Sequence, residues 1–296
     1  MTVPVGAIVD THVHIWDPAG GPFGVRYPWL TPELTALYHP FALADLDAEL
    51  GTAGVDVSGY VLVQAADSLA ETRALLAAAG SASRPTSVVG WLPLADAEAA
   101  TAALADLAGG PALVGVRHLI HDEPDLLWMS RSEVAAGMDI LVEAGLSFDA
   151  VAERPELLAQ IPAVAQRHSE LTIVIDHLGK PPFGTDGFDH WADLLAACAA
   201  EPGVVAKISG LATISDEYIR AESWQPAVDH ALAVFGPDRL MVGSDWPISG
   251  TAGGVHQIWE STLGCLTDLD ERDLRQVLSG TAERVYRLAP SGIPQS

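Results

Sequence analysis

Eight short apolar runs recur along the chain, and they limit its fold more than any other feature of the sequence. The runs are continuous rather than alternating and rich in β-branched residues, which is typical of strands buried on both faces of a parallel sheet. They are Ala7–Asp10, Tyr60–Val63, Ser87–Trp91, Leu113–Val116, Leu146–Phe148, Thr172–Ile175, Val204–Ile208 and Leu240–Val242.

Helical patterns lie between and after these runs. They are Ala42–Ala53, Leu69–Ala79, Ala97–Ala108, Arg131–Glu143, Pro155–His168, Asp189–Ala200, Gln225–Phe235 and Leu269–Val285. Strand and helix alternate with a repeat of roughly 30 residues, the length of a βα unit. Eight such units predict a closed (β/α)8 TIM barrel, with one domain over residues 1–296. An open doubly wound sheet is the alternative, and the lack of a GxGxxG motif in the sequence argues against it.

Composition narrows the range of partners. The 296 residues are 49% hydrophobic, and the formal net charge of −24 would repel a polyanion such as nucleic acid. No apolar run reaches the roughly 18 residues of a membrane span, and Met1–Ala7 carries no signal-peptide pattern. The two cysteines, Cys198 and Cys265, lack a metal-type spacing. We therefore expect a cytoplasmic protein that acts on a small molecule; its oligomeric state stays open.

Polar residues follow the expected strands, at the point where each strand ends. The carboxyl ends of all eight strands meet at one face of a TIM barrel, where active sites of this fold lie. In strand order these residues are His12 and His14; Gln64; Trp91; Arg117 and His118; Asp149; Asp176 and His177; Lys207 and Ser209; and Asp245. The sequence therefore predicts a site at this face.

Three of these side chains are expected to converge. His12 and His14 are two residues apart, so on a strand both rings point to the same side. Asp245 follows the eighth strand, which is the neighbour of the first in a closed barrel. We expect His12, His14 and Asp245 to meet, with His177 nearby.

The basic residues at this face suggest further contacts. Lys180 and Lys207 are the two lysines of the chain, and both fall near strand ends. Lys207 lies among apolar residues, so it needs a carboxylate or substrate partner if it is buried. Arg117 and His118 are adjacent and should face opposite sides of their strand. One would then enter the site, where a guanidinium could hold an oxyanion or a carboxylate, while the other anchors a loop.

One connection is much longer than the others. The stretch Pro18–Pro40 joins the first two strand units and is rich in proline and aromatic residues. A loop of this length at the mouth of a barrel serves either as a lid or as a structural cover. The sequence leaves both open.

The strand-end motifs resemble those of the amidohydrolase-related family of the L-fuconolactonase and L-rhamnonolactonase type. The resemblance runs in order from Ile8 to about Arg287 and rests on the segments Asp10–Asp17, Gly115–Ile120, Asp176–Pro181, Lys207–Leu211 and Gly243–Pro247. It implies lactone hydrolysis on a TIM barrel. Relatives in this family open sugar lactones, sulfomuconolactone or pyrone dicarboxylate lactone.

The chain departs from the two-metal pattern of that superfamily. Arg117 and His118 stand where a bridging lysine is expected, and Asp149 stands where a histidine is expected. The resemblance therefore leaves two possibilities, one divalent ion or no metal. His12, His14 and Asp245 would bind the ion, with help from His177, and their ligand types suit Zn²⁺ or Mn²⁺.

The expected reaction uses water activated by Asp245 as general base. His177, Arg117 or His118 would stabilise the oxyanion. Substrate-binding candidates are Gln64, Trp16, Trp91, Trp246, Lys180 and Lys207. A neutral sugar lactone is the expected substrate. The alternatives are a carboxylated or sulfonated lactone, and a decarboxylation on the same kind of barrel.

Overall fold

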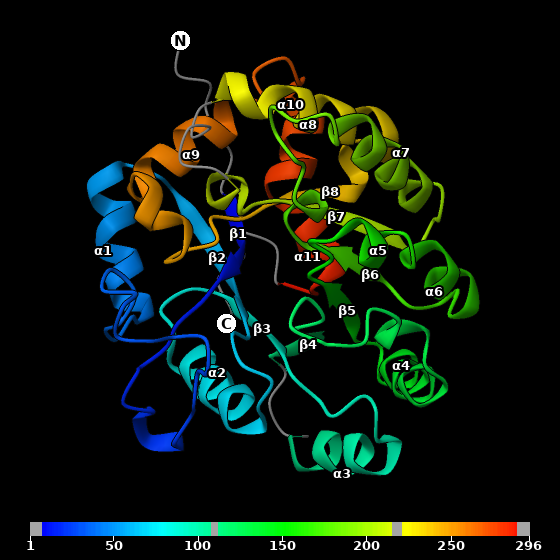
Figure 1. Cartoon of the computed structure of the whole chain (residues 1–296). Helices are drawn as coiled ribbons and strands as arrows, with labels where there is room; N and C mark the ends of the chain where they lie inside the picture. The colour runs from blue at the N-terminus through cyan, green and yellow to red at the C-terminus, as the bar shows by residue number, and fades with distance from the viewer. Residues whose placement is uncertain (1–7, 108–111, 215–220, 289–296) are drawn as a thin grey trace.

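Eight parallel strands form one sheet in sequence order in the computed structural model, which describes residues 8–107, 112–214 and 221–288. The strands are β1 (Ile8–Val13), β2 (Val57–Val63), β3 (Thr86–Gly90), β4 (Leu113–His118), β5 (Ser147–Ala150), β6 (Ile173–Ile175), β7 (Val204–Ile208) and β8 (Leu240–Val242). Figure 1 shows them at the centre of a ring of helices. The predicted TIM barrel is confirmed. Each strand lies within three residues of its predicted bounds, except that Ala7, where the first was expected to begin, lies outside the described residues.

The barrel closes between its first and last strands. Val13 forms a parallel bridge with Trp246, and the backbone N–H of Asp245 donates to the carbonyl of His12 at 2.8 Å. The buried carboxylate of Asp10 accepts a hydrogen bond from the backbone N–H of Ser244, also at 2.8 Å. This seam fixes the backbone of Asp245 against the strand that carries the two histidines.

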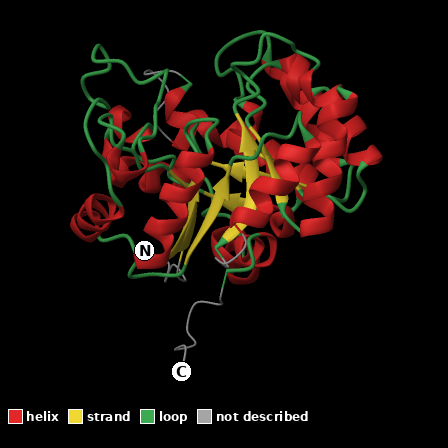
Figure 2. Ribbon diagram, turned by 90° about the horizontal axis from the view of Figure 1, so that it is seen from below, coloured by secondary structure: helices red, strands yellow, loops and turns green. Residues whose placement is uncertain are grey.

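The helices surround the sheet, and Figure 2 shows the strands enclosed between them. They are α1 (Leu43–Ala53), α2 (Leu69–Ser81), α3 (Ala97–Leu107), α4 (Ser132–Ala144), α5 (Pro155–Leu158), α6 (Ile161–Arg167), α7 (Phe188–Ala199), α8 (Ala221–Phe235), α9 (Gly254–Gly264), α10 (Glu271–Arg275) and α11 (Thr281–Val285). Two segments used in the predictions lie outside the described residues. They are Ala108, where the third helix was expected to end, and Met1–Ala7, which was searched for a signal peptide. No helix in the described ranges combines the length and apolar character needed to cross a bilayer.

Three helix predictions need correction. The pattern Leu269–Val285 is α10 and α11, with a π-helical segment, Gln276–Gly280, between them. The pattern Pro155–His168 is two helices, α5 and α6, because Pro162 has no N–H to bond the carbonyl of Leu158 and continue the first. Helix α9 was not expected. It begins at Gly254, directly after Gly253; these two glycines take φ values of 80° and 127°, and no side-chain cap marks the start of the helix.

The interior of the barrel has an apolar part and a charged part. Valines of several strands pack there with Met241 and with Tyr286, which follows α11. The hydroxyl of Tyr286 donates to the carboxylate of Asp149 at 2.6 Å. Asp149 and Lys207 are fully buried beside it. The C-terminal segment therefore fills the barrel and touches the charged groups beneath the mouth.

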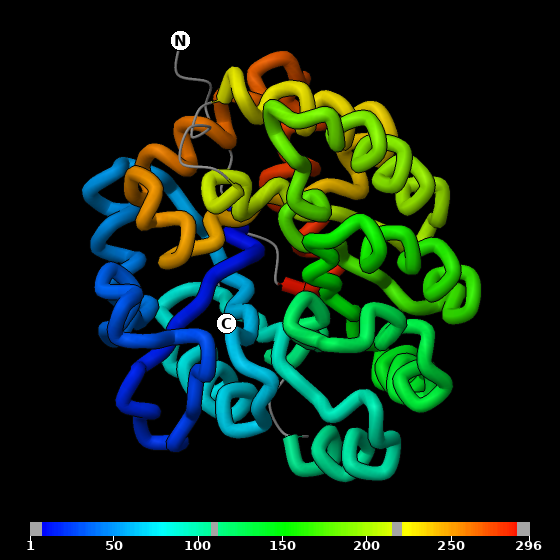
Figure 3. The backbone as a smooth tube through the Cα atoms, in the orientation of Figure 1, coloured from blue at the N-terminus to red at the C-terminus, as the bar shows by residue number. Residues whose placement is uncertain are grey.

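The long segment after β1 packs as one wall of the barrel mouth. It contains a single short 3₁₀ turn, Gly21–Phe23, and runs beside α2, as the dark blue tube in Figure 3 shows. Trp29 meets Trp16 edge to face, with ring centroids 5.2 Å apart. The Trp29 indole N–H also donates to the carbonyl of Ala65, just after β2, at 2.7 Å. These contacts show a packed cover; closure on a substrate stays a prediction.

Glu71 of α2 connects the long segment to the residues that follow β2. Its buried carboxylate accepts hydrogen bonds from the backbone N–H groups of Ala65 and Ala66, at 3.0 and 2.7 Å. It also bonds the hydroxyl of Tyr27 in the long segment. Burial raises the pKa of Glu71 to about 8, against the lowering effect of these hydrogen bonds.

Stability should therefore fall with rising pH because of Glu71. A carboxyl with a raised pKa contributes its full stability below its unfolded pKa, 4.5, and loses it as pH rises through about 8. Glu71→Gln mimics the protonated form. Urea unfolding at pH 5 and pH 8 should show a loss in the wild type that exceeds the loss in Glu71→Gln by about 1 kcal/mol or more. The exposed Glu98 gives the control, Glu98→Gln. Parallel losses in wild type and Glu71→Gln would contradict this account.

Candidate active site

A cavity of about 280 Å³ opens at the carboxyl ends of the strands. Its lining combines ionisable and apolar side chains: His14, Trp29, Ala65, Arg117, Leu119, His121, Asp122, Val151, Glu153, His177, Lys180, Thr213, Asp245 and Ile248. A larger groove, about 530 Å³, lies between α1 and α9, with Glu49 and His256 as its ionisable lining residues. Reactive groups converge in the smaller cavity, so it is the candidate site.

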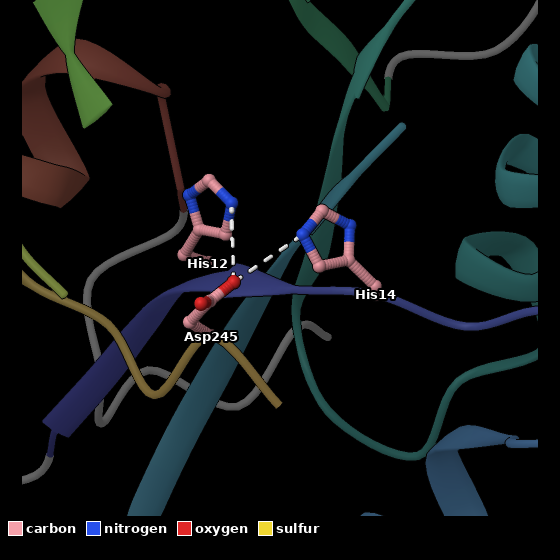
Figure 4. A group of neighbouring side chains, drawn as sticks. All are labelled: His12, His14 and Asp245. Carbon is pink, nitrogen blue, oxygen red and sulfur yellow. Dashed lines mark ion pairs between the residues drawn. The ribbon is translucent and has the colours of Figure 1, made fainter. Parts of the chain in front are cut away.

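His12, His14 and Asp245 meet at this cavity. The Oδ1 atom of Asp245 lies 3.8 Å from Nε2 of His12 and 3.5 Å from Nε2 of His14. Figure 4 shows both imidazoles directed at this oxygen. The other oxygen, Oδ2, accepts a hydrogen bond from the hydroxyl of Ser249 at 3.2 Å. The carboxylate is thus held at one oxygen and presents the other to the rings.

The backbone takes uncommon conformations at two site residues. Asp245 and His177 both have φ of 57°, in the left-handed region that residues with a Cβ seldom adopt. Such strain persists only where surrounding contacts enforce it, and it concentrates at functional sites. Gly210 makes room for one of these residues, because a Cβ there would lie 2.4 Å from Nδ1 of His177.

The neighbouring histidines favour the carboxylate form of Asp245. Burial alone would raise its pKa, but the charge of His177 and the hydrogen bond from His14, followed by the charges of His12 and His14, lower the pKa well below its usual range. Burial also lowers the pKa of His12, His14 and His177 below 6.5, which favours neutral rings.

Hydrogen bonds assign the tautomer of His14. Its Nδ1 lies 2.8 Å from the carbonyl oxygen of Val63, which can only accept, so Nδ1 carries the proton. When the ring is neutral, the lone pair of Nε2 faces the carboxylate of Asp245, another acceptor, and when the ring is protonated Nε2 donates to that carboxylate. A water that donates to both atoms, or a cation, satisfies this pair of acceptors.

The donor set fits one divalent cation. His12, His14 and Asp245 form one group of convergent ligand atoms, and His12, Asp176 and His177 form a second. A ring whose second nitrogen donates to a backbone carbonyl, as in His14, is typical of metal-binding histidines. Nε2 of His12, however, already has a neighbour: Nη1 of Arg117 lies 3.2 Å away. Arg117 therefore competes for one of the lone pairs that an ion would use.

A buried charge network lies beneath the cavity. Nζ of Lys207 is 2.7 Å from Asp149, 3.1 Å from Asp176 and 3.3 Å from Nδ1 of His12. Asp176 in turn pairs with Nη1 of Arg117 at 3.1 Å. Burial opposes ionisation of Asp176, but the charges of Lys207 and His12 hold its pKa well below the usual value. The network provides the carboxylate partners that a buried Lys207 was predicted to need, and it places Lys207 below the cavity wall.

Arg117 and His118 separate as adjacent strand residues should. Arg117 lines the cavity, and its guanidinium also donates to the carbonyl of Gln64. His118 does not line the cavity. Its Nδ1 accepts from the indole of Trp91 at 3.0 Å, its Nε2 meets Glu123 at 2.7 Å, and its ring stacks on Trp128 with centroids 4.1 Å apart. His118 and Trp91 thus anchor a loop, and a direct role for either residue stays a prediction.

The remaining expected substrate contacts divide in the same way. Lys180 lines the cavity, paired with Glu153 at 2.6 Å. Gln64 is buried and donates to the carbonyl of Arg117 at 3.0 Å, so it supports the wall. Trp16 donates to the carbonyl of Leu37, and Trp246 donates to Glu49 and packs on Phe41. In these positions Gln64, Trp16 and Trp246 support the wall, and direct substrate contacts by them stay predictions.

Sequence reasoning did not assign site roles to several lining residues. They are Trp29, Ala65, Leu119, His121, Asp122, Val151, Glu153, Thr213 and Ile248. Most of them follow a strand within a few residues. The polar residues just beyond each strand end therefore indicated this wall, which extends past the last residue of each strand. Trp29 and Ser249 carried no such signal, because long-range packing places them.

Comparison with known proteins agrees with this geometry. The family model described as amidohydrolase (Amidohydro_2) matches residues 9–288. An L-fucono-1,5-lactonase from Burkholderia ambifaria is 34% identical, over 96% of this chain and 97% of its own length. An L-fucono-1,5-lactonase from Burkholderia multivorans is 30% identical over the same shares.

A solved structure extends the comparison to three dimensions. A Burkholderia multivorans amidohydrolase with bound zinc is 29% identical and superposes with a TM-score of 0.85, covering 96% of this chain and 100% of that one. With a family model that matches nearly the whole barrel and relatives at or above 30% identity over most of their length, this chain belongs to the amidohydrolase (Amidohydro_2) family.

Proposed function

We propose that this protein hydrolyses a neutral sugar lactone, with L-fucono-1,5-lactone as the first substrate to test. The observation that carries the proposal is the geometry of Asp245, whose Oδ1 faces the imidazoles of His12 and His14 at a small cavity lined also by the guanidinium of Arg117. The two relatives named L-fucono-1,5-lactonase support the choice of substrate.

Asp245 is the general base in this reaction. A water lying between Oδ1 of Asp245 and Nε2 of His14 donates to both acceptors, and its lone pair is then free to attack the lactone carbonyl carbon. The proton passes to Asp245 as the C–O bond forms. Collapse of the tetrahedral intermediate breaks the bond from the carbonyl carbon to the ring oxygen, which takes the proton from Asp245. One lactone and one water give one hydroxy acid.

Arg117 and His177 stabilise the oxyanion. Nη1 of Arg117 lies at the centre of the site, next to His12. Nδ1 of His177 lies 2.9 Å from the hydroxyl of Ser209. When Ser209 donates this bond, Nε2 of His177 carries the proton and donates to the oxyanion. Donors positioned in advance by a buried network stabilise developing charge without reorganisation.

A divalent ion would be bound by His12, His14 and Asp245, with His177 nearby. When bound, it would supply Lewis-acid polarisation and lower the pKa of a bound water. Without an ion, the residues of the chain provide the base and the two hydrogen-bond donors.

The pairing of cations favours a neutral substrate. Arg117 is paired with Asp176, Lys207 lies in the buried network, and Lys180 is paired with Glu153. A carboxylated lactone would need a cation released from one of these pairs. A sugar lactone needs only donors and acceptors for its hydroxyls.

Replacing the base tests the proposal. Asp245→Asn should lower kcat on L-fucono-1,5-lactone by about 10²- to 10⁴-fold, measured as acid release with a pH indicator, with unchanged far-UV circular dichroism. Asp122→Asn alters another carboxylate of the cavity and should cost less than about tenfold. Near-wild-type turnover by Asp245→Asn, or release of CO₂ in place of acid, would overturn the proposal.

Removing Arg117 should strengthen metal binding. Zinc–nitrogen bonds are about 2.0–2.1 Å long, so an ion on Nε2 of His12 has to displace the guanidinium 3.2 Å away. Arg117→Met should bind Zn²⁺ at least about tenfold more tightly than the wild type in competition with a chromophoric chelator, and it should hydrolyse lactone more slowly. Lys180→Met removes the same charge without freeing His12 and serves as the control. Equal or weaker Zn²⁺ binding by Arg117→Met would contradict the competition.

A further inference from the structure

Lys180 and Glu153 form an ion pair across the rim of the cavity. Glu153 follows β5 and Lys180 follows β6, so neighbouring strands place the two side chains side by side. Nζ and Oε1 are 2.6 Å apart, and the side chains are 25% and 28% exposed. Both line the cavity, so a substrate would touch the pair.

The backbone holds Lys180 in this position. It has φ of 52° and ends a left-handed turn that begins at His177, to whose carbonyl its N–H donates at 2.9 Å. Two prolines, Pro181 and Pro182, follow and restrict the chain further. The ammonium group therefore reaches the cavity from a constrained point beside the proposed oxyanion donor.

Glu153 removes the cationic character that Lys180 would give the cavity. Among the described lining residues the cations are Arg117 and Lys180, whereas the carboxylates are Asp122, Glu153 and Asp245. Arg117 is also neutralised from below by Asp176. Arg117 belongs to the buried network through Asp176, whereas the partner of Lys180 is Glu153.

We propose that Glu153 is a specificity-determining residue, which excludes carboxylated lactones by occupying Lys180. The inference rests on the proposed lactone hydrolysis and deepens it. An anionic substrate has to approach a cavity with an excess of carboxylates and compete with Glu153 for the ammonium group. A neutral lactone leaves the pair intact and uses it as a donor and an acceptor for ring hydroxyls.

Binding of a ring dicarboxylate tests this role without relying on turnover. Isophthalate is a planar, doubly anionic ring that cannot be hydrolysed, and isophthalamide has the same shape without charge. Calorimetry should show that Glu153→Gln binds isophthalate on the order of tenfold or more tightly than the wild type, while binding of isophthalamide changes little. The truncated variant Glu153→Ala should shift in the same direction.

Two matched variants show whether a gain in isophthalate binding comes from the released Lys180 or from a general change in the charge of the cavity. Glu153→Gln combined with Lys180→Met should lose the gain, because no free ammonium group remains. Asp122→Asn removes one carboxylate of the same cavity but leaves the ion pair in place, and it should give a smaller gain.

Three results would overturn the proposal. They are unchanged isophthalate binding in both Glu153 variants, a gain that persists in the double variant, and an equal gain in Asp122→Asn. Failure of the lactonase proposal would appear separately, as no acid release by the wild-type enzyme from neutral lactones.

Discussion

The buried ion network around Lys207 is the interaction on which the site depends. A lysine without exposure inside a barrel is costly unless carboxylates surround it, and Asp149 and Asp176 meet that need at 2.7 and 3.1 Å. Asp176 then orients both His12 and Arg117, at 3.3 and 3.1 Å. The network thus fixes the positions of the His12 imidazole and the Arg117 guanidinium, which lie next to each other above it.

The seam between β1 and β8 supplies the other half of the site. Backbone hydrogen bonds across it hold Asp245 in a left-handed conformation against His12. Its carboxylate is anchored by Ser249 and faces the rings of His12 and His14. The general base and the two imidazoles beside it thus come from segments distant in sequence, and barrel closure brings them together.

The sequence predicted the barrel and the members of its charged centre, but not the wall of the cavity. Continuous β-branched runs mark strands buried on both faces, so β7 and β8 have the bounds expected from their residues alone. Strand-end polarity likewise pointed to His12, His14 and Asp245. It could not distinguish Arg117 from His118, because the choice depends on which face of β4 looks inward. The roles of Trp16, Trp246 and Trp29 depend on how the long segment packs, and local patterns do not encode that packing.

The central claim is that water attacks the lactone carbonyl at this centre. Isotope labelling tests it most directly, with excess enzyme, L-fucono-1,5-lactone and H₂¹⁸O in a single turnover, followed by mass spectrometry of the product. The account predicts one ¹⁸O atom, located in the carboxylate of the hydroxy acid. Label in the hydroxyl formed from the ring oxygen, or no labelled acid at all, would contradict it.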